Sequence, residues 1–264
     1  MLVTVKASPE PSKTYIDTVC VAGIRLSDKR PEWVRIYPVA FRHLRPDQQF
    51  KKFEVIEVDL TKSLTDSRKE SFRPNWETLE RVGKTPLSAP ARGPILEQLI
   101  GPNLCELRAA VKDDLTAPSL GLIEVADLKP LTFEKHGPWS ELQASGMAAA
   151  SQPDILGTED KTPALEPPRY KVKYKFGCVA PGCPGHEARI LDWELNALQY
   201  NNRRLPDAEL RALIVRKFHE EMWNENVRTY FFVGNFADIV KRRNYSVLGI
   251  YKPPRASSWA STLF

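Results

Sequence analysis

The sequence of 264 residues lacks the features that define several protein classes. It has no run approaching the ~18 apolar residues that a membrane-spanning helix requires. Its first residues, MLVTVKASPEPSK, contain no basic segment followed by an apolar one, and four cysteines are too few for a disulfide framework in a chain of this length. We therefore expect a cytoplasmic protein in a reducing compartment, with no membrane partner.

Common catalytic motifs are absent as well. The chain contains no G-x-x-x-x-G-K-[ST], G-x-G-x-x-G, G-x-S-x-G or H-E-x-x-H pattern, and no internal repeat. What remains is ordinary for a globular protein, with 42% hydrophobic and 27% charged residues. A chain this long can bury a sizeable core.

Charge is distributed unevenly along the chain. Residues 1–75 hold 14 Lys and Arg against 10 Asp and Glu, residues 76–168 hold 8 against 14, and residues 169–264 hold 16 against 9. Two basic ends flanking an acidic middle indicate that the ends meet a polyanion such as nucleic acid. The acidic middle is also a candidate surface for a protein partner.

A compact group of metal-binding residue types occupies the segment KYKFGCVAPGCPGHEARILDWEL. Cys178, Cys183 and His186 have the spacing C-x4-C-x2-H, and the Pro and Gly residues around them predict an exposed turn. Thiolate and imidazole ligands in tetrahedral geometry suit zinc, so we expect Zn²⁺ as the cofactor.

Three ligands leave the fourth coordination position open. A fourth protein ligand would make the site structural, and the candidates are Cys20, Cys105, His136, His219 or a carboxylate. A water molecule in that position would make the site catalytic instead. We favour the structural alternative.

The pattern of elements predicts an α+β protein. Short β-branched and aromatic runs in the first ~75 residues favour a small β-barrel-like or curved-sheet module, with Gly23 as a candidate bulge. Helices are expected in NWETLERV and in PILEQLIGPNLCELRAAVKDDL, interrupted at Gly101–Pro102, and the strand LGLIEVADLKPL is expected to return to the first sheet.

We therefore divide the chain into three parts. Residues 1–137 form the β-rich module with the following helices, and residues 138–168, rich in Pro, Ala, Ser and Gly, form a linker or long loop. Residues 169–264 form a zinc-stabilised α/β module with two helices and two final strands.

The strand RYKVKYKF that leads into the metal turn has two different faces. Because side chains alternate along a strand, Arg169, Lys171, Lys173 and Lys175 share one face and the apolar residues share the other. Four cations in a row are typical of an edge that contacts phosphates. The alternative is that the lysines protect an edge strand from pairing with other chains.

Further candidates for nucleic-acid binding lie in the N-terminal part. Aromatic rings interleaved with arginine in EWVRIYPVAFRHLR resemble surfaces on which bases stack, although the same face can be core. The loop DSRKESFRPN offers more cations, with a solvated, self-paired loop as the alternative. These candidates are Trp33, Arg35, Tyr37, Arg42, Arg45, Arg68 and Arg73.

Asp192 and Glu194 are the most enzyme-like pair. On a strand they would share a face and could hold a divalent metal. However, Leu191, Leu195 and Leu198 recur at helical spacing, and two residues two positions apart on a helix diverge by roughly 200°. The helical interpretation is stronger, which weakens a two-carboxylate catalytic site.

Both ends of the chain resemble a family of uncharacterised bacterial proteins. The resemblance rests on YIDTVCVAGI, WVRIYPVAFRHL and DSRKES near the N-terminus, and on CPGHEARILDWEL, YFFVGN and LGIYKPP near the C-terminus. It implies one architecture for these segments and no particular activity.

The sequence favours a nucleic-acid-binding protein with a structural zinc site. The first alternative is a metal-dependent nuclease or nucleotide-modifying enzyme that uses His186, Asp192 and Glu194 around an open metal position. The second is a subunit that binds protein partners in a larger assembly.

Overall fold

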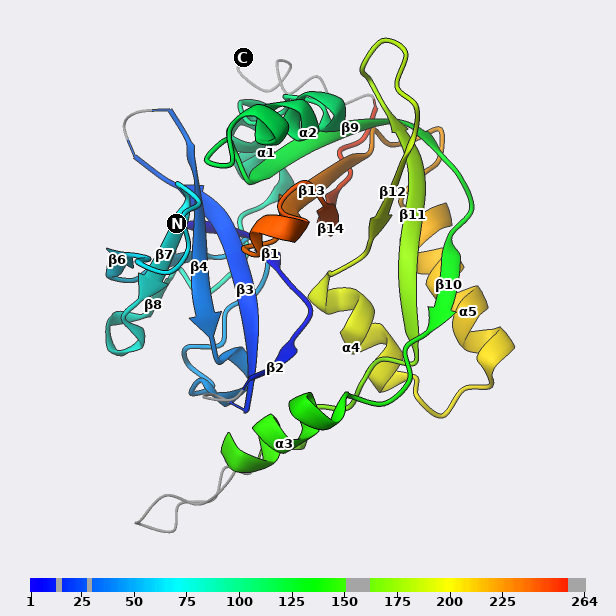
Figure 1. The fold of residues 1–264 in the computed structure, drawn as a ribbon. Coiled ribbons are helices and arrows are strands. Elements are labelled where there is room, and N and C mark those ends of the chain that lie inside the picture. The colour runs from blue at the N-terminus through cyan, green and yellow to red at the C-terminus, as the bar shows by residue number, and fades with distance from the viewer. Residues whose placement is uncertain (13–15, 28–29, 151–161, 256–264) are drawn as a thin grey trace.

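The computed structural model describes residues 1–12, 16–27, 30–150 and 162–255 and shows a mixed α+β fold built around two sheets (Figure 1). The first sheet is a curled half-barrel with the order β6-β7-β4-β3-β1-β5-β8, and β2 adds to β3. Its neighbours run antiparallel except β4 and β7, which are parallel. Its strands are β1 (Leu2–Lys6), β2 (Glu10–Ser12), β3 (Ile16–Arg25), β4 (Glu32–Val39), β5 (Val55–Glu57), β6 (Leu60–Lys62), β7 (Ser71–Pro74) and β8 (Glu80–Val82).

Two register shifts bend this sheet, one between Val3 and Val5 in β1 and one between Val19 and Val21 in β3. Such bulges increase the local twist of a strand pair. Gly23, expected to mark a bulge, lies at the first of these shifts, since it pairs with Val3 while Ala22 pairs with Val5. A Cβ at Gly23 would also lie 2.2 Å from the carbonyl oxygen of Leu2. Glycine at this position therefore allows β1 and β3 to approach closely.

The second sheet is formed by the later strands, in the antiparallel order β10-β11-β9-β13-β14, with β12 on the other side of β11. The strand over residues 120–128 was expected to return to the first sheet, and this prediction is wrong, because β9 pairs with β11 and β13. The strands are β9 (Leu120–Leu128), β10 (Thr132–Lys135), β11 (Tyr170–Cys178), β12 (His186–Arg189), β13 (Tyr230–Asn235) and β14 (Tyr245–Tyr251).

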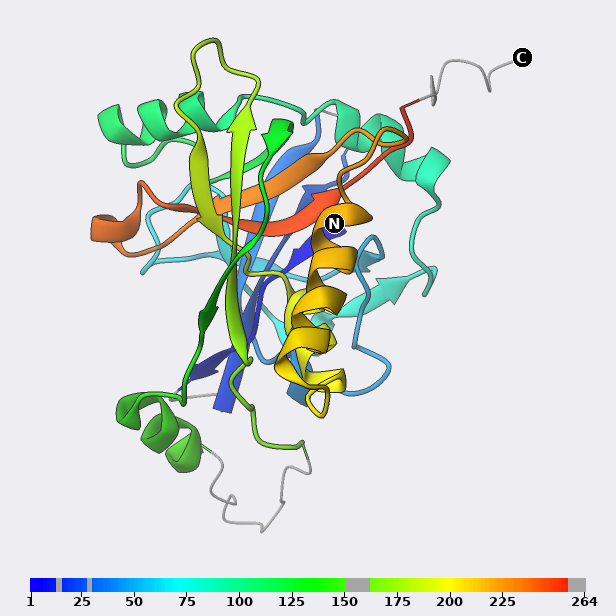
Figure 2. The same cartoon turned by 90° about the vertical axis from the view of Figure 1, so that its right-hand side faces the viewer.

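Five α-helices lie in the described part of the chain, and each of α1, α2 and α4 begins at a side-chain cap. The backbone N–H groups of a helix's first turn have no acceptor within the helix. In these three helices one such group donates to the side chain of the N-cap residue, which is Ser88, Asn103 or Asp192. Figure 2 shows α5 beside β11. Arg211 of α5 packs over the ring of Tyr170 in β11. The helices are α1 (Ala89–Glu97), α2 (Leu104–Asp113), α3 (Glu141–Ala150), α4 (Trp193–Asn201) and α5 (Asp207–Val215).

Two expectations about local structure need correction. The segment NWETLERV contains only a 3₁₀ turn, Trp76–Thr78, capped by Asn75, before the chain pairs with β5 as β8. The stretch predicted as a linker contains helix α3, which lies against β2 and β3. Residues 151–161 of that stretch lie outside the described residues. The predicted interruption at Gly101–Pro102 is confirmed, since it separates α1 from α2.

The two sheets share apolar contacts. One buried cluster joins β1 and β3 of the first sheet to β9, β13 and β14 of the second, and includes Leu2, Ile24, Leu122 and Phe232. A separate core lies inside each half. None of the helices that the structure describes has the length and apolar character needed to cross a membrane.

Candidate metal centre

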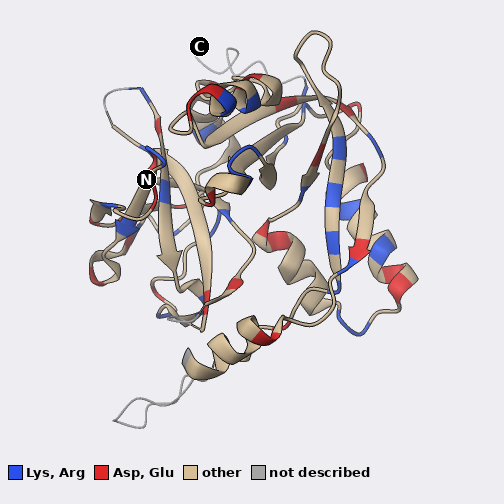
Figure 3. Cartoon of the chain, in the orientation of Figure 1, with Lys and Arg blue, Asp and Glu red and all other residues tan. Residues whose placement is uncertain are grey.

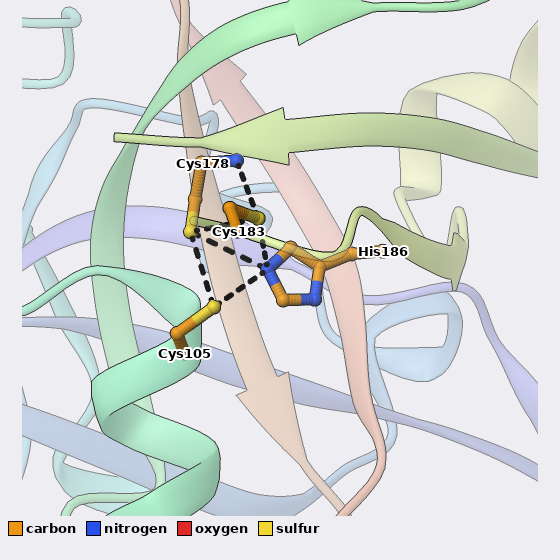
Figure 4. A group of neighbouring side chains, drawn as sticks. All are labelled: Cys105, Cys178, Cys183 and His186. Carbon is orange, nitrogen blue, oxygen red and sulfur yellow. Dashed lines mark hydrogen bonds between the residues drawn. The ribbon is translucent and has the colours of Figure 1, made fainter. Parts of the chain in front are cut away.

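Four side chains from α2, β11, β12 and the turn between these two strands meet at one point (Figure 4). Cys178 ends β11, Cys183 lies in the turn, His186 begins β12, and Cys105 lies in the first turn of α2. The Sγ atom of Cys178 is 3.7 Å from that of Cys105 and 3.5 Å from that of Cys183. The Nε2 atom of His186 lies 3.3 to 3.5 Å from all three sulfurs.

These separations fit a single metal ion. A tetrahedral ion with metal–sulfur bonds of ~2.3 Å and a metal–nitrogen bond of ~2.0 Å has ligand atoms about 3.5 to 3.8 Å apart. All four donor atoms here lie within 4.8 Å of one another. The cluster can therefore hold a metal ion with four protein ligands.

The turn is shaped so that the second thiol points back to the first. Gly182 and Gly185 have φ values of +66° and +83°, which a residue with a Cβ rarely adopts. The N–H groups of Cys178 and Gly185 both donate to the Sγ atom of Cys183 over 3.4 Å. Burial opposes ionisation, but these donors outweigh it, so the pKa of Cys183 is lowered.

The pKa shifts of Cys105 and His186 show why a cation suits the cluster. Burial and the neighbouring thiols Cys178 and Cys183 raise the pKa of Cys105 to about 12. Burial, followed by the charge of Arg108, lowers the pKa of His186 and favours the neutral imidazole that metals bind. A metal ion would compensate the thiolate charges that otherwise disfavour one another.

The fourth candidate ligand, Cys105, lies far from the other three in the sequence. Asn103 and Glu106 form a capping box that starts α2 and places Cys105 beside the turn. The other three named candidates lie elsewhere. Cys20 on β3 accepts a hydrogen bond from Arg35, His136 bonds Gly137, and His219 is in the π-helical turn Arg216–Glu220.

The cationic row on β11 alternates with buried residues, as expected (Figure 3). Lys171 lies 3.6 Å from a carboxylate oxygen of Glu134 on β10, while Lys173 and Lys175 lie 2.8 and 3.7 Å from those of Glu187 on β12. All these side chains are at least 30% exposed. Since β11 has paired neighbours on both sides, the lysines do not protect a free edge.

Arg169 lies at the start of this row and is more constrained. Its guanidinium donates to the backbone carbonyls of Leu205 and Arg203 and lies 3.2 Å from Asp207. These contacts join the beginning of β11 to the loop between α4 and α5.

A basic cavity of about 230 Å³ adjoins the metal centre, between β12 and the start of β14. His186 and Leu104 border it, so it lies next to two of the elements that supply ligands. One carboxylate, Glu187, belongs to its lining. The cations that line it are Arg108, Lys173, Arg189 and Arg243.

Two N-terminal arginines predicted to contact nucleic acid are buried between the sheets. The Arg35 guanidinium, 3% exposed, donates to the carbonyl oxygen of Ser119 and to Cys20. Arg68, 5% exposed, pairs with Asp66 at 2.6 Å and donates to the carbonyl of Asn235. Both side chains tie the first sheet to the second.

The remaining N-terminal candidates are dispersed. The Trp33 ring packs edge-on against Phe232 of the shared apolar core. Tyr37 is 50% exposed, and Arg42 pairs with the buried Asp17 at 2.7 Å. Arg73 and Arg45 are exposed, and Arg45 lies 3.4 Å from Asp47.

Asp192 and Glu194 lie at the start of α4, which confirms the helical interpretation. Asp192 caps the helix by accepting from the N–H of Glu194 over 3.0 Å. Burial raises the pKa of the Asp192 carboxyl to about 6, against the opposing charges of Lys52 and Lys6. The backbone of Asp192 pairs with that of Ala7, so this carboxyl is buried where the N-terminal segment meets the start of α4.

One feature that sequence patterns did not indicate is a cavity of about 760 Å³ between the N-terminal sheet and α4. Its aromatic wall combines Trp193 and Tyr200 of α4 with Phe41, which lies far from them in the chain. No local spacing could have brought these residues together.

The fold and the cluster define an α+β protein with a Cys₃His cluster that could hold a metal ion. Residues 102–264 match the family model described as Domain of unknown function (DUF8757), and the chain belongs to that family. Residues 1–98 match a second model, Domain of unknown function (DUF8758). No curated protein matches the chain. The expectation of an uncharacterised family agrees with these matches, and all four donor residues lie within the first of them.

Proposed function

We propose that the protein binds nucleic acid through the outer face of β11 and the adjoining basic cavity, with a zinc ion in the Cys₃His centre. The observation that carries this proposal is the cavity itself, in which four cations and one carboxylate lie beside the metal cluster. The lining has an excess of positive charge, so a negatively charged phosphate group suits it.

The lysine row supports the same function. Side chains two positions apart on a strand are about 6.6 to 6.8 Å apart, which is close to the separation of successive phosphates along an extended strand of nucleic acid. The ion pairs that Lys171, Lys173 and Lys175 make with Glu134 and Glu187 are exposed. Exposed pairs contribute little free energy, so phosphates can replace the carboxylates at small cost.

Zinc is the metal that this donor set suits best. Three thiolates and one imidazole are soft or borderline ligands, and four protein ligands are typical of structural zinc sites. The ion would hold the turn between β11 and β12 in place, and with it Lys173, Lys175 and Arg189. Elemental analysis of the purified protein should give one zinc per chain.

Binding is tested by fluorescence anisotropy with labelled single- and double-stranded DNA and RNA at two salt concentrations. We expect binding at low salt that weakens steeply as salt rises. The triple variant K171Q/K173Q/K175Q should lose at least tenfold in affinity and lower the salt slope by about 2, at ~0.7 per phosphate contact on a single strand.

The matched control is K51Q/K112Q/K252Q, which removes the same charge from exposed lysines outside β11. If both triple variants lose affinity equally, net charge and not the β11 face is responsible. Absence of binding at low salt to every probe contradicts the proposal. Co-purification of a protein would then favour the partner-binding alternative.

A further inference from the structure

The large cavity beside α4 has the dimensions of a small-molecule site. Its volume of about 760 Å³ falls within the ~300–1,000 Å³ range of typical ligand pockets. One wall comes from Phe41 and Gln49 of the N-terminal half, and another comes from α4. The site thus lies where the two family domains meet, a common position for ligand pockets.

The aromatic wall suits a flat ring. Phe41 and Trp193 pack edge to face with ring centroids 5.1 Å apart, so their rings are held in fixed orientations. Lys6 contributes to this, because its Nζ atom lies 4.3 Å from the Phe41 centroid and 5.2 Å from that of Trp193. Tyr200 is 40% exposed and presents a third ring. Stacking on such rings is the usual way in which proteins hold unpaired bases.

Polar groups in the cavity match the edges of a base. Asn196 on α4 lines the cavity and is only partly buried. Its amide offers both donors and an acceptor, the combination with which asparagine recognises a base edge. An apolar ligand would gain nothing from this group.

Cations gather at the same cavity. Arg42, Lys135, Arg169 and Arg203 all belong to its lining, against one lining carboxylate, Glu166. Arg169 also begins the row that continues through Lys171 and Lys173 along β11. The cavity and the proposed phosphate-binding face are therefore connected through one residue.

We propose that this cavity binds a nucleotide unit, with its base against Phe41, Trp193 and Tyr200 and its phosphate toward Arg169. This inference rests in part on the proposed function, because the unit would be an unstacked nucleotide of a strand whose backbone follows β11. A free nucleoside monophosphate shares the same chemistry and is the simplest probe.

The first experiment titrates the full chain with the four nucleoside 5′-monophosphates by calorimetry. We expect saturable binding with one site per chain, and at least tenfold weaker binding of inorganic phosphate, ribose 5-phosphate and the unphosphorylated nucleosides. Equal binding of inorganic phosphate and the monophosphates would show that the base makes no contact and would overturn the proposal.

Two variants locate the site. A197W places a large side chain at a position of α4 that lines the cavity, and Y200A removes one exposed ring. Each should weaken monophosphate binding at least tenfold. The control is L64A, which removes an exposed side chain of the N-terminal part, outside the lining. Unchanged affinity in folded A197W contradicts the proposal, and circular dichroism checks folding.

The same measurements separate this inference from the proposed function. K171Q/K173Q/K175Q should retain monophosphate binding while strand binding falls. If strands bind and A197W changes neither strand nor monophosphate affinity, the cavity proposal is wrong and the β11 proposal stands. If monophosphates bind and no strand does, the β11 proposal is wrong and the cavity binds free nucleotides.

Discussion

The two sheets differ in the polar groups that they bury. Beside the C-terminal sheet, three thiols and one imidazole meet at one point. The N-terminal sheet instead contains a buried ion pair. Glu54, 0% exposed in its side chain, accepts two hydrogen bonds from the Arg81 guanidinium at 2.8 and 3.0 Å. The first cluster could hold a metal ion, whereas the second is an ion pair between two side chains of the chain itself. This difference predicts that loss of metal affects one half selectively.

The largest effect is expected from loss of a metal ligand. C105S removes the ligand that joins α2 to the turn, and structural zinc sites bind their ion with ~10–16 kcal/mol, much of it coupled to folding. We expect the melting temperature to fall by at least ~10 °C, at about 2–4 °C per kcal/mol for a domain of this size. Calorimetry with elemental analysis measures both quantities.

The matched control is C20S, which alters the one cysteine outside the cluster. It should keep its metal and most of its stability. Hydrogen exchange should further show that chelation exposes β11 and β12 while β1, β3 and β4 stay protected. Uniform loss of protection in both sheets would contradict the comparison.

The reverse experiment breaks the ion pair of the N-terminal sheet. R81M leaves the Glu54 carboxylate buried without its partner, and breaking a buried pair in this way costs ~3–5 kcal/mol. Denaturant unfolding should show this loss with no change in metal content. R45M, which breaks the exposed pair with Asp47, should cost less than ~1 kcal/mol. Similar costs for the two variants would mean that burial of Glu54 is unimportant.

Local sequence patterns predicted most elements of the fold but not how they assemble. The break at Gly101–Pro102 was recognisable because the effect of a proline on a helix acts within a few residues. The pairing of β9 with β13 was not recognisable, since the apolar residues of a strand do not indicate which strands will pair with it. Residues 80–82 form a strand because β5 supplies its hydrogen bonds, although the local pattern favours a helix.

The metal centre illustrates the same limit. Cys178, Cys183 and His186 lie within nine residues, so their spacing indicated a metal. Cys105 precedes them by 73 residues, and only the packing of α2 on the second sheet brings its thiol to the turn. For Arg35 and Arg68 the local sequence gave a wrong indication of exposure. The sequence around an arginine does not show whether its guanidinium faces solvent or, as here, donates to a buried carbonyl.

A third experiment probes the junction between the two halves. Burial raises the pKa of Asp192 from 3.8 to about 6, so protonation favours the folded state. This contribution, up to about 3 kcal/mol, is complete below pH ~4 and is lost as the pH rises through about 6. D192N keeps the oxygen that caps α4 but does not ionise.

The free energy of unfolding should therefore decrease less between pH 4 and 7 in D192N than in the natural sequence. Taking the difference between the two proteins removes the contributions of other groups, including the metal ligands. D47N, at a 70% exposed carboxylate, is the control and should leave the profile unchanged. Parallel profiles for D192N and the natural protein would show that Asp192 does not titrate in this range.

The smallest effect on stability is expected on the outer face of β11. Glu187 is 44% exposed, and hydrogen bonding from Lys173 lowers the pKa of its carboxyl. Because such pairs contribute little, E187Q should change the free energy of unfolding by less than ~1 kcal/mol.

The same change frees Lys173 and Lys175 for phosphate, so nucleic-acid affinity at low salt should rise about two- to threefold. E209Q on α5 removes an equal charge from an exposed site outside this face and should raise affinity less. A fall in affinity for E187Q would mean that the carboxylate positions the lysines for binding and does not compete with phosphate.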